Sequence, residues 1–264
     1  MVTNVKAVKE LALLDKRLDL RPFTEYRQPI QIETDLSWTA EGSAKVTIGK
    51  TVVMAGVKLS LEKPYNDTSD QGGIMINAEL LPLSSSEYEP GPPGIKAVEL
   101  ARVTDRGIRE AKAIDLKALC IVPGERAWFV TVDIISINDD GNLFDAANLA
   151  TLAALKVARF PQVDPKTWAI DYKQKTAKYL PLIKEPVSVT IYKIKGKLLV
   201  DPLIEEEKSA EARLTVSIDK NSTISALQKG GEGTLTLTEV DTIIDLAIEK
   251  AKELRAVLEQ VSLP

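Results

Sequence analysis

The sequence contains no histidine in its 264 residues. This absence excludes Ser-His-Asp and Cys-His catalytic sites and every histidine-ligated metal site within the chain. Cysteine occurs once, as Cys120 in an apolar run that predicts a buried strand, so an internal disulfide is impossible. A single cysteine is typical of a reducing compartment, and we expect a cytoplasmic protein.

The sequence also lacks an excess of positive charge and any long hydrophobic run. Against 38 Asp and Glu residues it has 34 Lys and Arg, a formal net charge of -4, so a nucleic-acid site would have to be local. No run reaches the ~18 apolar residues of a membrane span, and residues 1–6 contain no apolar signal region. We therefore expect a globular protein that makes no contact with a membrane.

What the sequence does contain is an order of strands followed by a helix that occurs twice, around 28–114 and around 187–260. This order predicts the α+β class with two similar halves, a first over 1–186 and a second over 187–264. Residues 161–165 are the best linker candidate. The predicted strands cover residues 30–32, 44–48, 52–61, 74–80, 116–122, 127–137, 187–194, 198–200, 212–218, 223–227 and 234–237. The predicted helices cover residues 4–14, 99–110, about 143–160 and a last stretch capped by Thr238.

One predicted helix, residues 99–110, carries three arginines on one face. Arg102, Arg106 and Arg109 stand at i, i+4 and i+7 and so fall within about 60° of arc, while apolar residues gather on the opposite side. Spacing alone favours a solvated surface helix whose arginines pair weakly with neighbouring acidic residues. The arginine row therefore does not reveal a function by itself.

Several ordered motifs resemble the RNase PH-type family. Residues 16–27, KRLDLRPFTEYR, resemble its Arg-x-Asp-Gly-Arg opening, and the match continues in order through residues 42–58, 77–80, 89–93, 99–109 and 132–142. The resemblance implies the RNase PH-like fold, also called ribosomal protein S5 domain 2-like. Within the family the chain looks like the archaeal exosome ring subunit that alternates with a phosphorolytic subunit and is not itself catalytic.

Two departures from the family pattern predict that the chain has no catalytic residue. An RNase PH-type site needs donors that cradle phosphate and a carboxylate near the leaving oxygen. Active members carry a Gly-Ser/Thr-Arg sequence in the phosphate turn, where this chain reads DDGNLFD over 139–145, and two carboxylates there repel phosphate. In an ungapped alignment Arg213 occupies the second catalytic aspartate, and a guanidinium cannot serve as a carboxylate general acid.

The resemblance also implies partners and an RNA-binding role. The chain would pair with the homologous catalytic subunit as a heterodimer, and three pairs would close a hexameric ring for 3'-to-5' phosphorolytic RNA degradation, on which RNA-binding cap subunits dock. Arg102, Arg106 and Arg109 match RNA-contacting positions of the family and would guide single-stranded RNA to the partner's active site. Arg21 and Arg27 are weaker candidates, and we expect a structural ion pair for at least one of them.

Two alternatives remain open at this point. The chain could phosphorolyse RNA alone through a carboxylate such as Asp201 or Glu207, or it could be purely architectural, with the arginine helix at the partner interface. Incubation of the purified chain with RNA and phosphate distinguishes the first alternative, and RNA crosslinking to residues 102–109 distinguishes the second.

The remaining candidate sites favour structural interpretations, and no metal or cofactor is expected. The acidic run at 205–207 with Asp201 predicts a solvated loop, and the glycine-rich residues 230–233 predict a hairpin loop because a P-loop lysine is missing. The few aromatic residues form no stacking series. We expect core or interface packing for Trp38, Trp128, Phe129 and Trp168.

Overall fold

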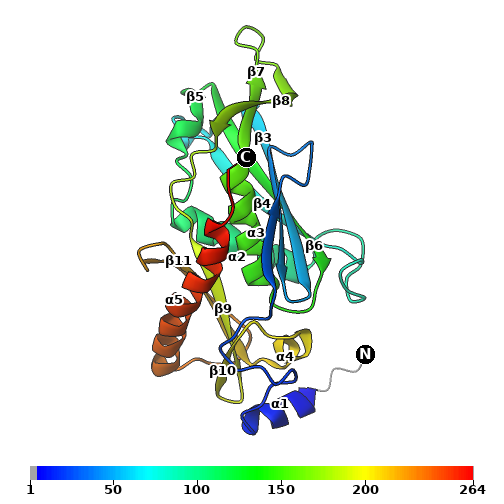
Figure 1. Ribbon diagram of the computed structural model, residues 1–264. Helices are drawn as coiled ribbons and strands as arrows, with labels where there is room; N and C mark the ends of the chain where they lie inside the picture. Colours follow the sequence, from blue (N-terminus) through cyan, green and yellow to red (C-terminus); the bar gives the residue numbers. More distant parts are fainter. Residues whose placement is uncertain (1–4, 264) are drawn as a thin grey trace.

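The computed structural model describes residues 5–263 and confirms the α+β class, with sheets packed against a central helix, α3 (Leu143–Val157; Figure 1). The first sheet has the strand order β1-β2-β3-β6-β4, with β5 paired to β6. Its pairs are antiparallel except for β4 and β6. Its strands are β1 (Ile30–Thr34), β2 (Gly42–Ile48), β3 (Thr51–Glu62), β4 (Gly73–Leu80), β5 (Cys120–Val122) and β6 (Arg126–Asn138).

The second sheet, with the order β10-β9-β11-β12, has two faces of different chemistry. On the face toward α2 (Ile95–Glu110) and α3, small hydroxyl residues of β9 and β11 form hydrogen bonds across the strands, Ser188 with Ser217 and Thr190 with Thr215. The opposite, apolar face packs against α5 (Leu237–Glu259). The strands are β9 (Val187–Ile194), β10 (Lys197–Val200), β11 (Ala212–Ile218) and β12 (Ile224–Gly230).

Helix α3 is buried along nearly its whole length. Every α3 residue except Lys156 is buried, which explains the run of alanines, because small side chains let the helix approach strands of both sheets. No helix within residues 5–263 has the length and apolar character needed to cross a bilayer. The helices are α1 (Val5–Leu13), α2 (Ile95–Glu110), α3 (Leu143–Val157), α4 (Ile204–Ser209) and α5 (Leu237–Glu259), with 3-10 turns η1 (Asn66–Thr68) and η2 (Lys117–Leu119).

The first residue of β2, Gly42, has no room for a side chain because the end of α3 lies directly against it. A Cβ atom at Gly42 would stand 2.3 Å from the carbonyl oxygen of Ala154 and 2.7 Å from Cα of Ala158. Both are backbone atoms, so a side chain at this position could fit only if the helix moved away from the sheet.

The linker predicted at 161–165 is wrong. Strand β7 (Arg159–Val163) pairs antiparallel with β8 (Ile170–Tyr179) to form a separate two-stranded ribbon. Pro161 lies inside β7 and disturbs the pairing register on either side, because proline has no N–H to donate. The prolines therefore mark a hairpin strand and its loop. The boundary predicted between residues 186 and 187 stays a prediction.

Two further elements differ from the prediction. Residues 234–236 are not a strand: Thr236 caps α5, its side chain accepting from the Glu239 N–H while the Glu239 carboxylate accepts from the Thr236 N–H. The cap therefore lies two residues before Thr238. The strand predicted over 116–122 consists of η2 and the short β5, and Cys120 is half-buried. Position 4, the predicted first residue of α1, lies outside the described residues.

The large aromatic residues divide between core and surface. Trp128 is buried and packs against Phe160, and Phe129 contacts Tyr65 edge to face. Trp168 is half-buried and lies against Arg126. Trp38 is 96% exposed and so does not pack in the core of this chain, and the alternative of interface packing stays a prediction for it.

Candidate nucleic-acid interface and the neighbouring polar site

Helix α2 presents the arginine row to solvent, as its spacing predicts. Leu100, Thr104 and Ile108 are buried against the rest of the protein, and the Thr104 hydroxyl donates to the Leu100 carbonyl within the helix. Arg102, Arg106 and Arg109 are all exposed. The helix therefore separates an apolar packing face from a cationic face.

The three arginines are not equivalent. Arg109 lies 2.8 Å from the carboxylate of Asp105, one turn earlier, and also donates to the carbonyl of Ile74. Within residues 5–263, Arg102 and Arg106 form no ion pair with a carboxylate. Two guanidiniums are therefore free to take an external anion, whereas the third is partly occupied.

Arg102 and Arg106 line a hollow between α2 and β12. Its volume is about 400 Å³, and its walls include Ile95, Val98 and Gln228. Ile95 is 90% exposed, so the rim offers apolar contact beside the two charges. Guanidiniums beside apolar surface suit a phosphate backbone with its sugars, because such contacts require no base-specific donor or acceptor.

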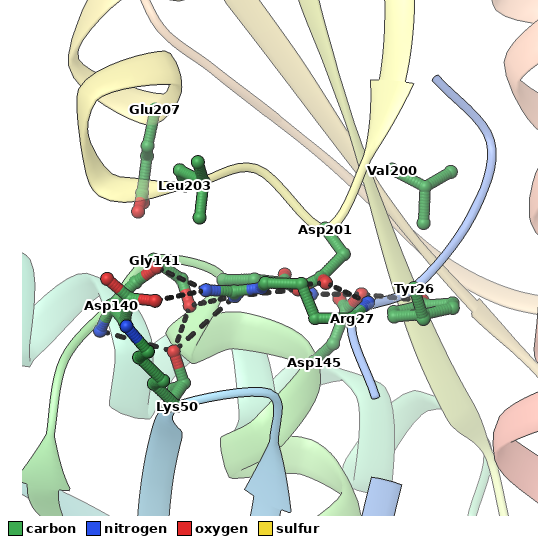
Figure 2. Close-up of polar contacts among 12 residues, drawn as sticks. Tyr26, Arg27, Lys50, Asp140, Gly141, Asp145, Val200, Asp201, Leu203 and Glu207 are labelled. Carbon is green, nitrogen blue, oxygen red and sulfur yellow. Dashed lines mark hydrogen bonds and ion pairs between the residues drawn. The ribbon is translucent and has the colours of Figure 1, made fainter. Parts of the chain in front are cut away.

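A second polar site lies around Asp201, at the end of β10 (Figure 2). Asp201 is fully buried, and its oxygens lie 2.8 Å from Nη2 of Arg27, 2.8 Å from Nη1 of Arg21 and 3.0 Å from Nδ2 of Asn142. Figure 2 shows the Arg27 side chain extended between Asp201 and the Asp140 turn, where it forms a second ion pair of 2.9 Å. We name Asp201, Arg21, Arg27, Asn142 and Asp140 together the Asp201 cluster.

The Asp201 cluster confirms the structural ion pair expected for at least one of Arg21 and Arg27, because both pair with Asp201. Burial alone would lower the pKa of Arg27, but the hydrogen bonds and charges of Asp201 and Asp140 hold that pKa above its ordinary value. Arg27 is therefore a buried cation, neutralised by carboxylates and inaccessible to RNA. The Asp201 carboxylate in turn is buried and accepts from Arg21, Arg27 and Asn142, which leaves it without access to a substrate.

The carboxylates and carbonyls of the turn over 139–145 already bond to other groups of the protein. The Asp139 carboxylate accepts from Tyr88, from Lys96 at 3.1 Å and from the Gly141 N–H at 3.0 Å. The carbonyls of Asp140 and Gly141 face the Arg27 guanidinium, at 2.5 and 3.0 Å. The turn thus gives its carbonyl oxygens and carboxylates to internal cations, an arrangement opposite to the N–H cradle that a phosphate needs.

Arg213, on β11, connects α2 to the second sheet. Its Nη2 lies 2.6 Å from the Glu99 carboxylate, and its guanidinium stands 4.2 Å from the centroid of the Phe144 ring. The guanidinium also lies over Gly230, where a Cβ atom would be 1.9 Å from Nη1. The side chain is therefore enclosed by packing as well as by charge.

Besides Glu99, which pairs with Arg213, a second acidic residue, Glu207, lines the space beside Arg213. A hollow of about 260 Å³ is lined by Lys96, Phe144, Glu207 and Arg213. Glu207 accepts from the Tyr192 hydroxyl with Oε1, at 3.1 Å, while its Oε2 is buried without a hydrogen-bond partner. Burial lowers the pKa of Lys96, but Glu207 and Asp139 outweigh it, so the net shift is upward.

The solvated loop predicted at 205–207 is wrong. These residues belong to α4, and Glu206 is buried, with its carboxylate 2.6 Å from the guanidinium of Arg17. Arg17 also donates to the carbonyls of Val200 and Asp201. The opposite charges of the arm at 16–27 and the run at 201–207 were the only sequence signal of this contact, and they did not specify which residues pair.

Comparison of the sequence with models of protein families identifies its fold. The model described as 3' exoribonuclease family, domain 1, matches residues 26–161, and domain 2 of the same family matches residues 184–250. The chain belongs to the 3' exoribonuclease family. This membership confirms the RNase PH-type resemblance that the ordered motifs predict, and with it the predicted fold.

Several members of the 3' exoribonuclease family that are similar to this chain come from archaea. The exosome complex component Rrp42 of Methanosarcina acetivorans is 45% identical over 250 residues, which cover 94% of this chain and 90% of the relative. A solved structure described as an Archaeoglobus fulgidus exosome with RNA bound to the active site matches with 41% identity and a TM-score of 0.86, covering 96% of each chain. An archaeal exosome core matches with 38% identity and a TM-score of 0.84, covering 97% of this chain and 96% of that one.

Within this family, Arg213→Asp is expected to destabilise the protein without creating phosphorolytic activity. A carboxylate at 213 would face Glu99 and would leave the Phe144 ring without its cation, at a cost of about 1–3 kcal/mol. Activity should stay absent because Asp139 and Asp140 still fill the turn. Thermal unfolding and nucleoside diphosphate release measure the two outcomes, with Arg213→Lys as the charge-conserving control. Phosphate-dependent RNA cleavage by Arg213→Asp would contradict this interpretation.

Proposed function

We propose that this chain is the non-catalytic, RNA-guiding subunit of an archaeal exosome ring. The observation that carries the proposal is the pair of exposed, unpaired guanidiniums of Arg102 and Arg106 beside the hollow between α2 and β12. Similarity to Rrp42 components and to exosome structures over nearly the whole chain supports the setting. Its ligand would be single-stranded RNA, held by phosphate contacts that read no base.

The absence of catalysis is supported by the chemistry of two places. The 139–145 turn directs carboxylates and carbonyls where a phosphate would need donors, and Arg213 stands where the resemblance implies a catalytic aspartate. The catalytic carboxylate and phosphate site would then belong to the homologous partner subunit. This chain would support the 3'-to-5' exoribonuclease activity of the ring by binding the RNA that the partner shortens.

Assembly resolves the apparent conflict between an acidic chain and an RNA ligand. In a ring of three heterodimers, arginines of both subunit types facing one channel add locally, whatever the net charge of each chain. Cap RNA-binding subunits would deliver RNA to this channel. The cytoplasmic setting, expected from the single cysteine, remains part of the proposal.

The double variant Arg102→Ala/Arg106→Ala is expected to weaken single-stranded RNA binding by the assembled ring. Each copy of the chain that contacts the RNA loses two phosphate contacts, which should reduce the slope of log K against log salt by about 1.4, and affinity near 0.1 M salt by roughly 10- to 30-fold, for each such copy. Fluorescence anisotropy over a salt series measures both quantities, and size-exclusion chromatography checks assembly.

The control is Lys220→Ala/Lys252→Ala, which removes two exposed, unpaired charges elsewhere on the chain. The control variant should bind RNA as the wild type does. Equal affinities for the arginine variant and the control, with assembly intact, would refute the RNA-guiding role and leave an architectural subunit.

A second candidate function is phosphorolysis by this chain alone, which the unpaired Oε2 of Glu207 favours. The purified chain, incubated with RNA and inorganic phosphate, should release no nucleoside diphosphates until the partner subunit is added. Release by the chain alone, abolished in Glu207→Gln, would establish the second candidate instead.

A further inference from the structure

The β7-β8 ribbon stands apart from both large sheets. Figure 1 places it at one end of the molecule, opposite α1, α4 and β10. Residues Val163 and Ile170 pack against the main core, whereas most of β8 is exposed. The ribbon therefore extends a polar surface from a base that is fixed by apolar contacts.

Positive charge is concentrated on this ribbon and its continuation. Residues 159–184 contain six Lys or Arg and two Asp, a net charge of +4 in a chain whose total is -4. The rest of the chain therefore carries -8. The six basic residues are Arg159, Lys166, Lys173, Lys175, Lys178 and Lys184.

The two aspartates of the ribbon do not neutralise its lysines. Asp164 accepts from the backbone N–H groups of Lys166 and Thr167, which lower its pKa, and Asp171 accepts from the N–H of Lys173. None of the five lysines forms an ion pair with a carboxylate of residues 5–263, whereas Lys58 beside the ribbon pairs with Glu41. The ribbon charges are thus available to an external polyanion.

Aromatic rings lie among these cations. The Tyr172 ring is exposed and lies 4.5 Å from Nζ of Lys58, and the Trp168 ring lies 4.5 Å from the Arg126 guanidinium. Cations beside partly exposed rings are the chemistry that binds single-stranded nucleic acid, since phosphates meet the charges and bases stack on ring faces. An acidic protein partner would need the charges but not the rings.

We propose that the β7-β8 ribbon is a second binding site for single-stranded RNA, separate from the α2 hollow. Lys173 and Lys178 contact phosphates, and Tyr172 provides a stacking face for a base. The ligand class rests on the proposed function, but the residues and the surface are independent of it. Lysine ammonium groups on flexible stems suit contacts that do not depend on sequence.

The test uses the full-length chain and a fluorescein-labelled 20-nucleotide oligouridylate in anisotropy titrations over a salt series. Lys173→Gln/Lys178→Gln is expected to lose roughly 10- to 30-fold in affinity near 0.1 M salt and about 1.4 in salt slope. Tyr172→Leu should lower affinity about fivefold with an unchanged slope, because stacking involves no counterion release. Lys220→Gln/Lys252→Gln is the matched control, and circular dichroism melts confirm that each variant folds.

Parallel titrations of Arg102→Ala/Arg106→Ala distinguish the two proposals. If only the arginine variant loses affinity, the ribbon site is refuted and the proposed function stands. If only the ribbon variants lose affinity, the ribbon site stands, and the α2 role is decided by the titration of the assembled ring. The ribbon variants could instead bind RNA as the control does but lose affinity for polyglutamate, a probe for an acidic protein partner. In that case the ribbon serves an acidic protein and the proposal is overturned.

Discussion

Replacement of Asp201 by alanine is expected to lower the free energy of unfolding by about 3–5 kcal/mol. The fully buried carboxylate of Asp201 accepts from Arg21, Arg27 and Asn142. Its removal leaves the positive charge of the buried Arg27 guanidinium only partly neutralised. Within residues 5–263, Asp140 remains as the one carboxylate paired with Arg27, and it is partly exposed. Chemical denaturation measured at neutral pH gives the difference directly.

The control for Asp201→Ala is Glu33→Ala, which removes a carboxylate from an exposed ion pair with Lys45. That pair should contribute less than about 1 kcal/mol, because water screens it and both side chains lose freedom in forming it. A change at Asp201 as small as the change at Glu33 would contradict the structural role of the Asp201 cluster.

Asp145→Asn is expected to stabilise the protein at alkaline pH and to have little effect below pH 4. Burial raises the pKa of Asp145 to about 7 from its ordinary 3.8, although Tyr26 and Asn142 donate hydrogen bonds to it. A folded-state pKa above the unfolded value means that the folded protein holds the proton more tightly. The stability that this gives is complete below about pH 4, decreases as pH rises through 7 and is absent above it.

The difference between Asp145→Asn and the wild type should therefore grow with pH and reach a size of roughly 4 kcal/mol by pH 8, the equivalent of about three pKa units. Urea unfolding at intervals from pH 4 to pH 8.5 measures it. The exposed Asp241→Asn variant provides the same chemical change at the surface. Parallel stability curves for Asp145→Asn and the wild type would refute the raised pKa.

The sequence predicted well those features that depend on local periodicity. The arginine face of α2, the apolar stripe of α5 and most strands follow from spacings of 3.6 or 2 residues, which a single segment displays by itself. The family resemblance rested instead on motif residues that occur in a fixed order along the chain. Whether Arg102, Arg106 and Arg109 bind RNA stays a prediction, because exposure and charge are necessary for that role but do not establish it.

Features that depend on distant contacts could not be predicted. Arg27 and Asp201 are 174 residues apart, and nothing in either segment specifies the other among the many acidic and basic residues. The linker error at 161–165 has a related cause, because Pro161 indicates a break while its pairing with β8 depends on the fold. The N-cap of α5 was misplaced because Thr236 and Thr238 both precede an acidic residue by three positions.

The contact between Arg213 and Gly230 couples substitutions at two positions that face each other across β11 and β12. The guanidinium occupies the volume that a Cβ atom at 230 would require, so even alanine there conflicts with Arg213 in its present position. Alanine at 230 would fit only if the end of the flexible Arg213 side chain moved, and that movement would disturb its contacts with Glu99 and Phe144. A side chain at 230 and the guanidinium at 213 therefore compete for the same space.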